Sequence, residues 1–290
     1  MTARSLPEAR NRRPPAAASA RVSRAVAPAP LAAAPGGEQP RPAWPARAAW
    51  GALGLAAVLL CWWLGTEALP APDSLARRFG PTPTFASAYD LLSGSDLPLH
   101  ILVSLRRVLV GLALAMVIGI PLGLAVGSWR RLEAALSPAM QFLRMISPLS
   151  WMPIAVMVFG VGDDPVYFLL TFAAVWPILL NTAAGVQQLD ARWLLLARSV
   201  SATRWETLRT VVLPGVLGHV LTGVRLAIGI LWIVLVPCEM LGVSAGMGYF
   251  ILDTRDRLAY SELMAMVLLI GALGFLLDAA ARSLYRLWRG

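Results

Sequence analysis

Long apolar stretches alternate with short polar ones from Ala48 to the end of the chain. An α-helix needs about 20 mostly apolar residues to cross a bilayer, and six stretches reach that range. They cover residues 48–66, 104–128, 138–161, 165–187, 214–238 and 261–282. The pattern predicts an all-α polytopic membrane protein with six transmembrane helices.

The beginning of the chain has a different pattern. Residues 1–46 are rich in alanine, proline and arginine and show no apolar periodicity. Such a segment cannot bury enough apolar surface to offset the entropy that ordering would cost. A transit peptide is the alternative interpretation, but the repeated prolines and the missing amphipathic spacing disfavour it. We expect a disordered tail over 1–46 and a transmembrane domain over 47–290.

The charges add an orientation to this picture. Only 14% of the residues are charged, and all 25 basic residues are arginines, which give a formal net charge of +9. The tail, two alternate loops and the C-terminus hold 17 arginines, and the opposite connections hold six. Since arginine gathers on the cytoplasmic side of membranes, both termini are predicted to be cytoplasmic. The arginines form no single stripe with stacking aromatics, which argues for membrane lipid and against nucleic acid as a partner.

Residue sets typical of catalysis or metal binding are missing from the sequence. The two histidines, His100 and His219, stand alone, and the two cysteines form no C-x-x-C pair. Asp163 and Asp164 form an acidic pair in a predicted external turn, with no basic residue beside them. The chain contains no lysine and therefore no ATP-binding P-loop. We expect no catalytic residue, no metal site and no cofactor, so that a separate polypeptide must supply any energy.

The most informative segment is the predicted cytoplasmic loop 190–213. A first helical piece is expected over 190–200, and a second opens at Thr203, where Glu206 completes the spacing of a capping box. The second piece has an apolar face, and Pro214 then fits the first turn of the fifth span. We predict a short amphipathic helix that is joined to a spanning helix and docks on a cytoplasmic partner. The alternative is a helix that lies on lipid headgroups.

This segment resembles the EAA loop of binding-protein-dependent ABC importer permeases. That motif reads Glu-Ala-Ala, three residues, Gly, nine residues, Ile-x-Leu-Pro. Here Val211-Val212-Leu213-Pro214 forms its end, Ser201 stands at the glycine, and Ala197 stands at the second alanine. Leu195 and Leu196 replace the glutamate and the first alanine, so the loop departs from the motif at three residues. The spacing is kept throughout.

Further stretches are similar to the nitrate/sulfonate/taurine-type subfamily, namely those that begin at His100, Ile118, Ser147, Pro177 and Leu221. The resemblance implies a type I permease fold in the bacterial inner membrane. It also implies a second permease copy, a cytoplasmic ATPase dimer that binds the ATP, and a periplasmic or lipid-anchored substrate-binding protein. The residues expected to couple the permease to the ATPase are Ala197, Ser201, Ala202, Thr203, Trp205, Glu206, Leu208, Leu213 and Pro214.

Polar residues inside the predicted spans are candidates for the translocation path. They are Arg144, Asn181, Arg225 and Glu239. A charge at membrane depth normally faces a cavity or a partner, although a long arginine also reaches the headgroups from the end of a span. Asn181 is also expected to bond between helices, and Glu239 is placed at the external mouth. The resulting hypothesis is a permease for a small anion such as nitrate, a sulfonate or taurine. The alternatives are an ABC permease for another small solute and an independent secondary transporter.

Overall fold

The computed structural model describes residues 44–94 and 97–289, and every regular element in these ranges is helical. The predicted tail over 1–46 lies almost wholly outside the described residues, and Trp44–Ala46 belong to the first helix. The chain divides into two units, residues 1–54 and 55–290. Of the first unit only the beginning of α1 is described, and all the other described helices belong to the second unit.

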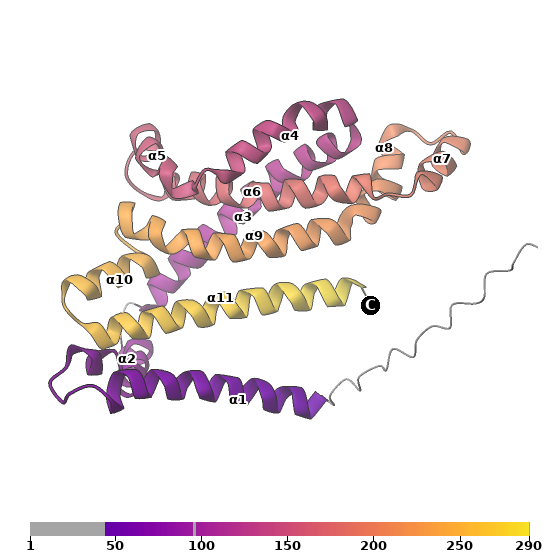
Figure 1. The fold of residues 1–290 in the computed structure, drawn as a ribbon. Coiled ribbons are helices and arrows are strands. Elements are labelled where there is room, and N and C mark those ends of the chain that lie inside the picture. The colour runs from indigo at the N-terminus through magenta and orange to yellow at the C-terminus, as the bar shows by residue number, and fades with distance from the viewer. Residues whose placement is uncertain (1–43, 95–96, 290) are drawn as a thin grey trace, which may run out of the picture. The chain divides into compact units, whose positions relative to one another are not determined.

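Eleven α-helices are described, and Figure 1 shows their course. They are α1 (Trp44–Trp63), α2 (Pro81–Gly94), α3 (Leu97–Ser128), α4 (Arg130–Met145), α5 (Met152–Phe159), α6 (Asp163–Gln187), α7 (Ala191–Ser199), α8 (Arg204–Thr207), α9 (Leu213–Gly242), α10 (Met247–Asp256) and α11 (Tyr260–Arg289). Short π-helical segments extend α1 over Leu64–Ala68 and join α8 to α9 over Leu208–Val212, while Leu75–Phe79 and Pro148–Trp151 are 3₁₀-helical.

Five described helices are long and apolar enough to cross a membrane, and the count rises to six if one bent pair is a single span. Four of the five match predicted spans within the described second unit: α3, α6, α9 and α11. The helix that includes α1 covers the remaining one, over Ala49–Ala68. The predicted all-α polytopic fold is therefore confirmed.

The predicted third span, 138–161, is not one straight helix. Its residues are divided between α4 and the pair formed by Pro148–Trp151 and α5, which meet at a bend of 85°. Ile146 and Ser147 are extended, as the residue before a proline prefers, and α4 therefore ends before Pro148. With eight residues α5 is about 12 Å long, well short of the thickness of a bilayer. The prediction found the apolar, helical stretch correctly, but it missed the bend in the backbone.

The core of the second unit lies around α6, which packs between α3 and α9 (Figure 1). Small residues allow this close approach, because a Cβ at Gly123 of α3 would lie 2.6 Å from the Leu179 carbonyl oxygen of α6. On the other side, a Cβ at Gly223 of α9 would lie 2.8 Å from the Pro177 carbonyl oxygen. Glycine at such contacts is typical of packed membrane helices. A smaller apolar cluster joins α2, α10 and α11 around Met247 and Met266.

Candidate functional site

The loop between α6 and α9 begins with α7, whose two ends are capped. The Asp190 side chain accepts a hydrogen bond from the Arg192 N–H at the start of the helix. At its end the Ala202 N–H donates to the Ala197 carbonyl and the Ser201 N–H donates to the Arg198 carbonyl, both at 3.0 Å. This pair of bonds is a Schellman motif, which requires a left-handed residue after the helix. That residue is Ser201, with φ at 58°.

The second part of the loop is a capped helix that runs without a break into a long one. Thr203 Oγ1 accepts from the Glu206 N–H at 3.2 Å, and the Thr203 N–H donates to Glu206 Oε2 at 2.7 Å. The predicted capping box is therefore present. From Arg204 the helix continues through the π-helical Leu208–Val212 to Gly242, with Leu213 and Pro214 in the first turn of α9. α8 is therefore continuous with the fifth predicted span.

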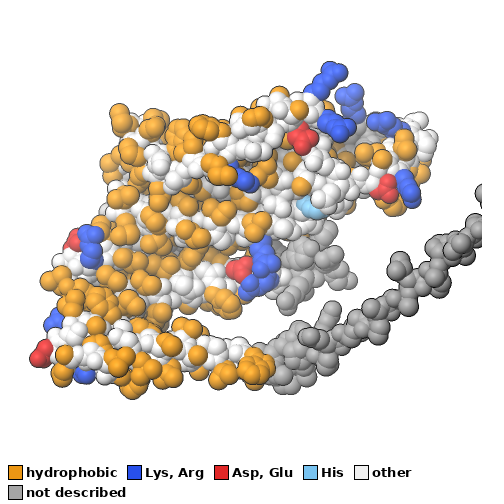
Figure 2. All heavy atoms as spheres, in the orientation of Figure 1, with side chains coloured by type: hydrophobic (Ala, Val, Ile, Leu, Met, Phe, Trp, Pro, Cys, Tyr) orange, Lys and Arg blue, Asp and Glu red, His pale blue; other side chains and the backbone are white. Residues whose placement is uncertain are grey.

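The loop exposes large apolar side chains. The side chains more than half exposed are Trp193, Leu195, Leu196, Val200 and Trp205. By contrast Ala197, at the second alanine of the motif, is buried, and Leu208 and Ala202 are partly buried. Figure 2 shows basic side chains gathered at the end of the second unit that carries α7 and α8, next to a broad apolar surface. A surface that combines exposed tryptophans and arginines is typical of a protein interface.

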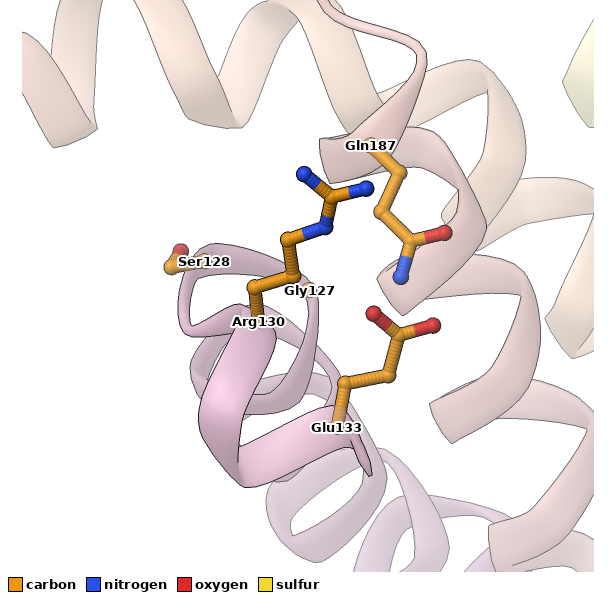
Figure 3. A pocket seen from close by; sticks show the side chains of 5 residues that line it. All are labelled: Gly127, Ser128, Arg130, Glu133 and Gln187. Atoms are coloured by element: carbon orange, nitrogen blue, oxygen red, sulfur yellow. The ribbon is translucent and has the colours of Figure 1, made fainter. Parts of the chain in front are cut away.

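One cavity borders this loop, and a second lies between the neighbouring ends of α3, α4 and α6. One of about 730 Å³ lies between the end of α3 and the loop, and its lining includes Trp129, Arg198 and Leu208. A second of about 510 Å³ is shown in Figure 3, where the side chains of Arg130, Glu133 and Gln187 extend into a shared space. The first cavity leaves open space between the loop and the end of α3.

A buried charge network lies along the first half of α3, far from the end of α3 that faces the loop. Arg107 is 3% exposed and donates to Glu239 Oε1 of α9 at 2.7 Å and to Asp163 Oδ1 of α6 at 2.6 Å. The Glu239 carboxylate is fully buried and also accepts from Ser104 Oγ and from the Gly248 N–H, at 2.8 and 2.9 Å. Buried charges require partners of this kind, and here the partners come from α3, α6, α9 and the start of α10.

The backbone around Gly246 fits tightly over this network. Gly246 has φ at 129°, and a Cβ there would lie 2.5 Å from the Glu239 carboxyl carbon and 2.6 Å from an Arg107 nitrogen. Its N–H donates to His100 Nδ1 at 3.0 Å. Only glycine permits both this conformation and this approach. The network therefore fixes the turn between α9 and α10 against α3.

The four candidates for the translocation path have different surroundings. Arg144 is exposed on α4, and Asn181 donates to the Pro177 carbonyl of its own helix at 2.8 Å, while its expected bond between helices stays a prediction. Glu239 is buried in the network described above and not at an open mouth. Arg225 of α9 is paired through its Nε with Asp278 Oδ1 of α11 at 3.1 Å.

Comparison with known proteins identifies the family. A family model described as the inner membrane component of binding-protein-dependent transport systems matches residues 115–289, more than half of the chain. The chain belongs to this family. It is a permease subunit of an ABC importer, and its relatives are transport subunits and not enzymes.

Named relatives and a solved structure agree with this family. The permease is 37% identical to the bicarbonate transport system permease protein CmpB of Synechococcus elongatus, over 80% of this chain and 86% of that protein. It is 36% identical to the nitrate import permease protein NrtB of Leptolyngbya laminosa, over 64% and 68%. It is 30% identical to the taurine transport system permease protein TauC of Escherichia coli, over 80% and 86%. A chain of the MetNI methionine ABC transporter, in an inward-facing conformation, shares the fold with a TM-score of 0.52 at 19% identity, covering 63% of the permease and 91% of that chain.

Two features of the permease were not predicted from the sequence. Asp163 was expected to have no basic neighbour, and this was wrong, because Arg106 and Arg107 of α3 both pair with it. The spacing of His100, Ser104 and Arg107 on one face of a helix was the available signal. Asp278 was not singled out at all. Among the described residues no group of His, Cys, Asp and Glu is arranged to hold a metal ion.

Replacing Ser201 by glycine should stabilise the loop. A non-glycine residue in the left-handed region costs about 1 kcal/mol, and glycine removes that cost without touching the Schellman bonds. Hydrogen exchange of the α7 amides in the purified permease should slow down. Ser199→Gly is the matched control, because it places glycine inside α7 and should speed up the same exchange by a similar free energy. Faster exchange in both variants would contradict the role of a left-handed Ser201 in capping the end of α7.

Proposed function

We propose that this permease forms the path by which a small anion such as nitrate, bicarbonate, taurine or another sulfonate enters the cell. Its transport-system relatives carry bicarbonate, nitrate and taurine in their names, and 30–37% identity over most of the chain supports a substrate of that class. Family membership in a binding-protein-dependent system argues against the alternative of an independent secondary transporter. In this proposal both termini are cytoplasmic, with the tail 1–46 outside the membrane domain 47–290.

The observation that carries the mechanism is the loop 190–213. It exposes Trp205 and other apolar side chains, and it continues without a helical break into α9. We propose that a cytoplasmic ATPase dimer binds ATP and docks on this loop, and that a second permease copy completes the path. A periplasmic or lipid-anchored binding protein delivers the anion. Closure of the ATPase pair then moves α8, and α9 moves with it as one rigid body.

Within the loop each expected residue has a physical role. Trp205 and Leu213 offer apolar contact area, while Thr203 and Glu206 fix the start of α8. Ser201 sets the corner between α7 and α8. Ala197 and Ala202 join that corner through a backbone hydrogen bond, and Leu208 and Pro214 lie in the helix that runs on into α9.

Isolation of the permease from the membranes of its host cell tests the proposal. The tagged permease should co-purify with a separate ATPase in mild detergent and should hydrolyse no ATP after that subunit is removed. Cells that lack the permease gene should lose uptake of at least one of labelled nitrate, bicarbonate and taurine. Unchanged uptake of all three anions, or purification with no ATPase, would contradict the proposal.

A further inference from the structure

Arg225 lies inside the predicted fifth span. It lies 12 residues after Leu213, the first residue of α9, which corresponds to about 18 Å along the helix. The predicted span 214–238 has its centre at Leu226, the next residue. Its partner Asp278 lies four residues before the end of the predicted sixth span, so the pair lies inside both predicted spans and toward the end at which the sixth span stops.

The exposed side of α9 that carries Arg225 includes a stripe of polar and small residues. The Arg225 side chain is 51% exposed although it lies inside a predicted span. Thr222 is exposed on the same side of the helix, and a Cβ at Gly218 or Gly229 would meet nothing within 4 Å. Lipid-facing positions normally carry apolar side chains, and charges inside a membrane face water-filled cavities or partners. Leu226 and Ile233 are exposed beside this stripe, so it is the stripe of Gly218, Thr222, Arg225 and Gly229 that suits an aqueous path better than lipid.

Asp278 of α11 is shared between two arginines. Its Oδ1 pairs with Arg225 of α9 at 3.1 Å, and its Oδ2 pairs with Arg282, one turn further along α11. Arg282 also lies over the Phe275 ring at 5.7 Å. The three charged groups carry a net charge of +1, so the cluster as a whole attracts an anion.

We propose that Arg225 binds the transported anion, and that Asp278 yields its place at Arg225 to the anion while it stays paired with Arg282. This inference rests on the proposed function and names the site at which that function selects for negative charge. The ligand class is a small singly charged oxyanion or sulfonate, because several oxygens on one centre match the donor fork of a guanidinium group.

The shared carboxylate makes such an exchange energetically feasible. The pair is only partly buried, with 51% of the Arg225 side chain and 32% of the Asp278 side chain exposed, so breaking it costs less than breaking a fully buried pair. Here an arriving anion neutralises Arg225, and Arg282 continues to neutralise Asp278. No charge in this cluster is left alone at any stage. The ion pair thus neutralises Arg225 when no anion is present.

Uptake by variants in the host cell, which supplies the native ATPase and binding protein, tests this site. Labelled nitrate, bicarbonate and taurine are the probes, and maximal uptake is divided by the amount of permease in the membrane. Arg225→Gln should lower the maximal uptake per permease about tenfold, the size expected for loss of one close charge contact. Arg225→Lys keeps the charge and should retain more uptake than the glutamine variant. Arg257→Gln is the matched control, because Arg257 also pairs with two acids, Asp253 and Glu262, but lies between α10 and α11. Uptake by this variant should be unchanged.

A charge swap separates anion binding from a structural ion pair. The double variant Arg225→Asp/Asp278→Arg keeps the net charge and the pair but moves the positive group from α9 to α11. We expect the swap to restore no uptake. Wild-type uptake in Arg225→Gln, or recovery in the swap, would overturn the inference. Failure of the proposed function is a different result, because the unaltered permease would then transport none of the three anions.

Discussion

Replacement of Leu208 by proline should abolish uptake while the permease stays in the membrane. The Leu208 N–H donates to the Arg204 and Trp205 carbonyls where α8 passes into the π-helical segment. Proline removes this donor and clashes with the preceding turn, which costs about 3 kcal/mol or more. A movement of α8 would then no longer reach α9. The measurement is uptake of the transported anion, divided by the amount of permease in the membrane.

The control for this variant is Leu208→Met. It keeps the backbone hydrogen bonds and nearly the same apolar volume at a partly buried position, and it should retain uptake. The proline lies outside the long apolar part of α9, so insertion of the fifth span should proceed in both variants. Normal uptake by the proline variant would contradict the role of a continuous helix in coupling.

Arg107→Met should be the most destabilising single substitution among the charged residues described. It leaves the fully buried Glu239 carboxylate with hydrogen bonds but no counter-charge, and removal of one partner from a buried pair costs about 3–5 kcal/mol. The free energy of unfolding in mixed micelles measures the effect. The double variant Arg107→Met/Glu239→Met should recover part of the loss, because neither charge is then left alone.

An exposed ion pair provides the comparison. Arg257→Met breaks the pairs with Asp253 and Glu262, all of them substantially exposed, and should cost less than about 1 kcal/mol. A loss in Arg107→Met no larger than that in Arg257→Met would show that the network does not hold α3, α6 and α9 together. The loss of unfolding free energy in the double variant should be smaller than the summed losses of Arg107→Met and Glu239→Met measured separately. A larger loss would contradict the role of the buried charges.

Most of the fold followed from the apolar pattern because a bilayer imposes one requirement on every span. A stretch such as 165–187 has to satisfy its backbone hydrogen bonds internally, and a helix is the solution that a single segment has. The break at Ser147-Pro148 marks the limit of hydropathy as a guide. Hydropathy alone does not separate a kinked span from two helices that meet at 85°, and the outcome depended on the conformation of Ile146 and Ser147.

The candidate site was predictable where its contacts are local in sequence. Thr203 and Glu206 are three residues apart, and their capping box follows from that spacing. The left-handed residue at Ser201 explains physically why the related motif has glycine there. Arg107 and Glu239, by contrast, are 132 residues apart, and Arg225 and Asp278 are 53 apart. Such pairs depend on how the helices pack, which no periodicity in one segment specifies.

Contact between the loop 190–213 and a cytoplasmic ATPase is the central requirement of the proposed mechanism. A photoreactive side chain in place of Trp205, which is 67% exposed, tests this contact in intact host membranes. The same side chain in place of Val117, exposed on α3 within a predicted span, is the control. We expect illumination to join position 205, and not position 117, to a subunit with an ATP-binding P-loop. Labelling of lipid alone at position 205 would instead show a helix that rests on the membrane surface, and it would contradict the mechanism.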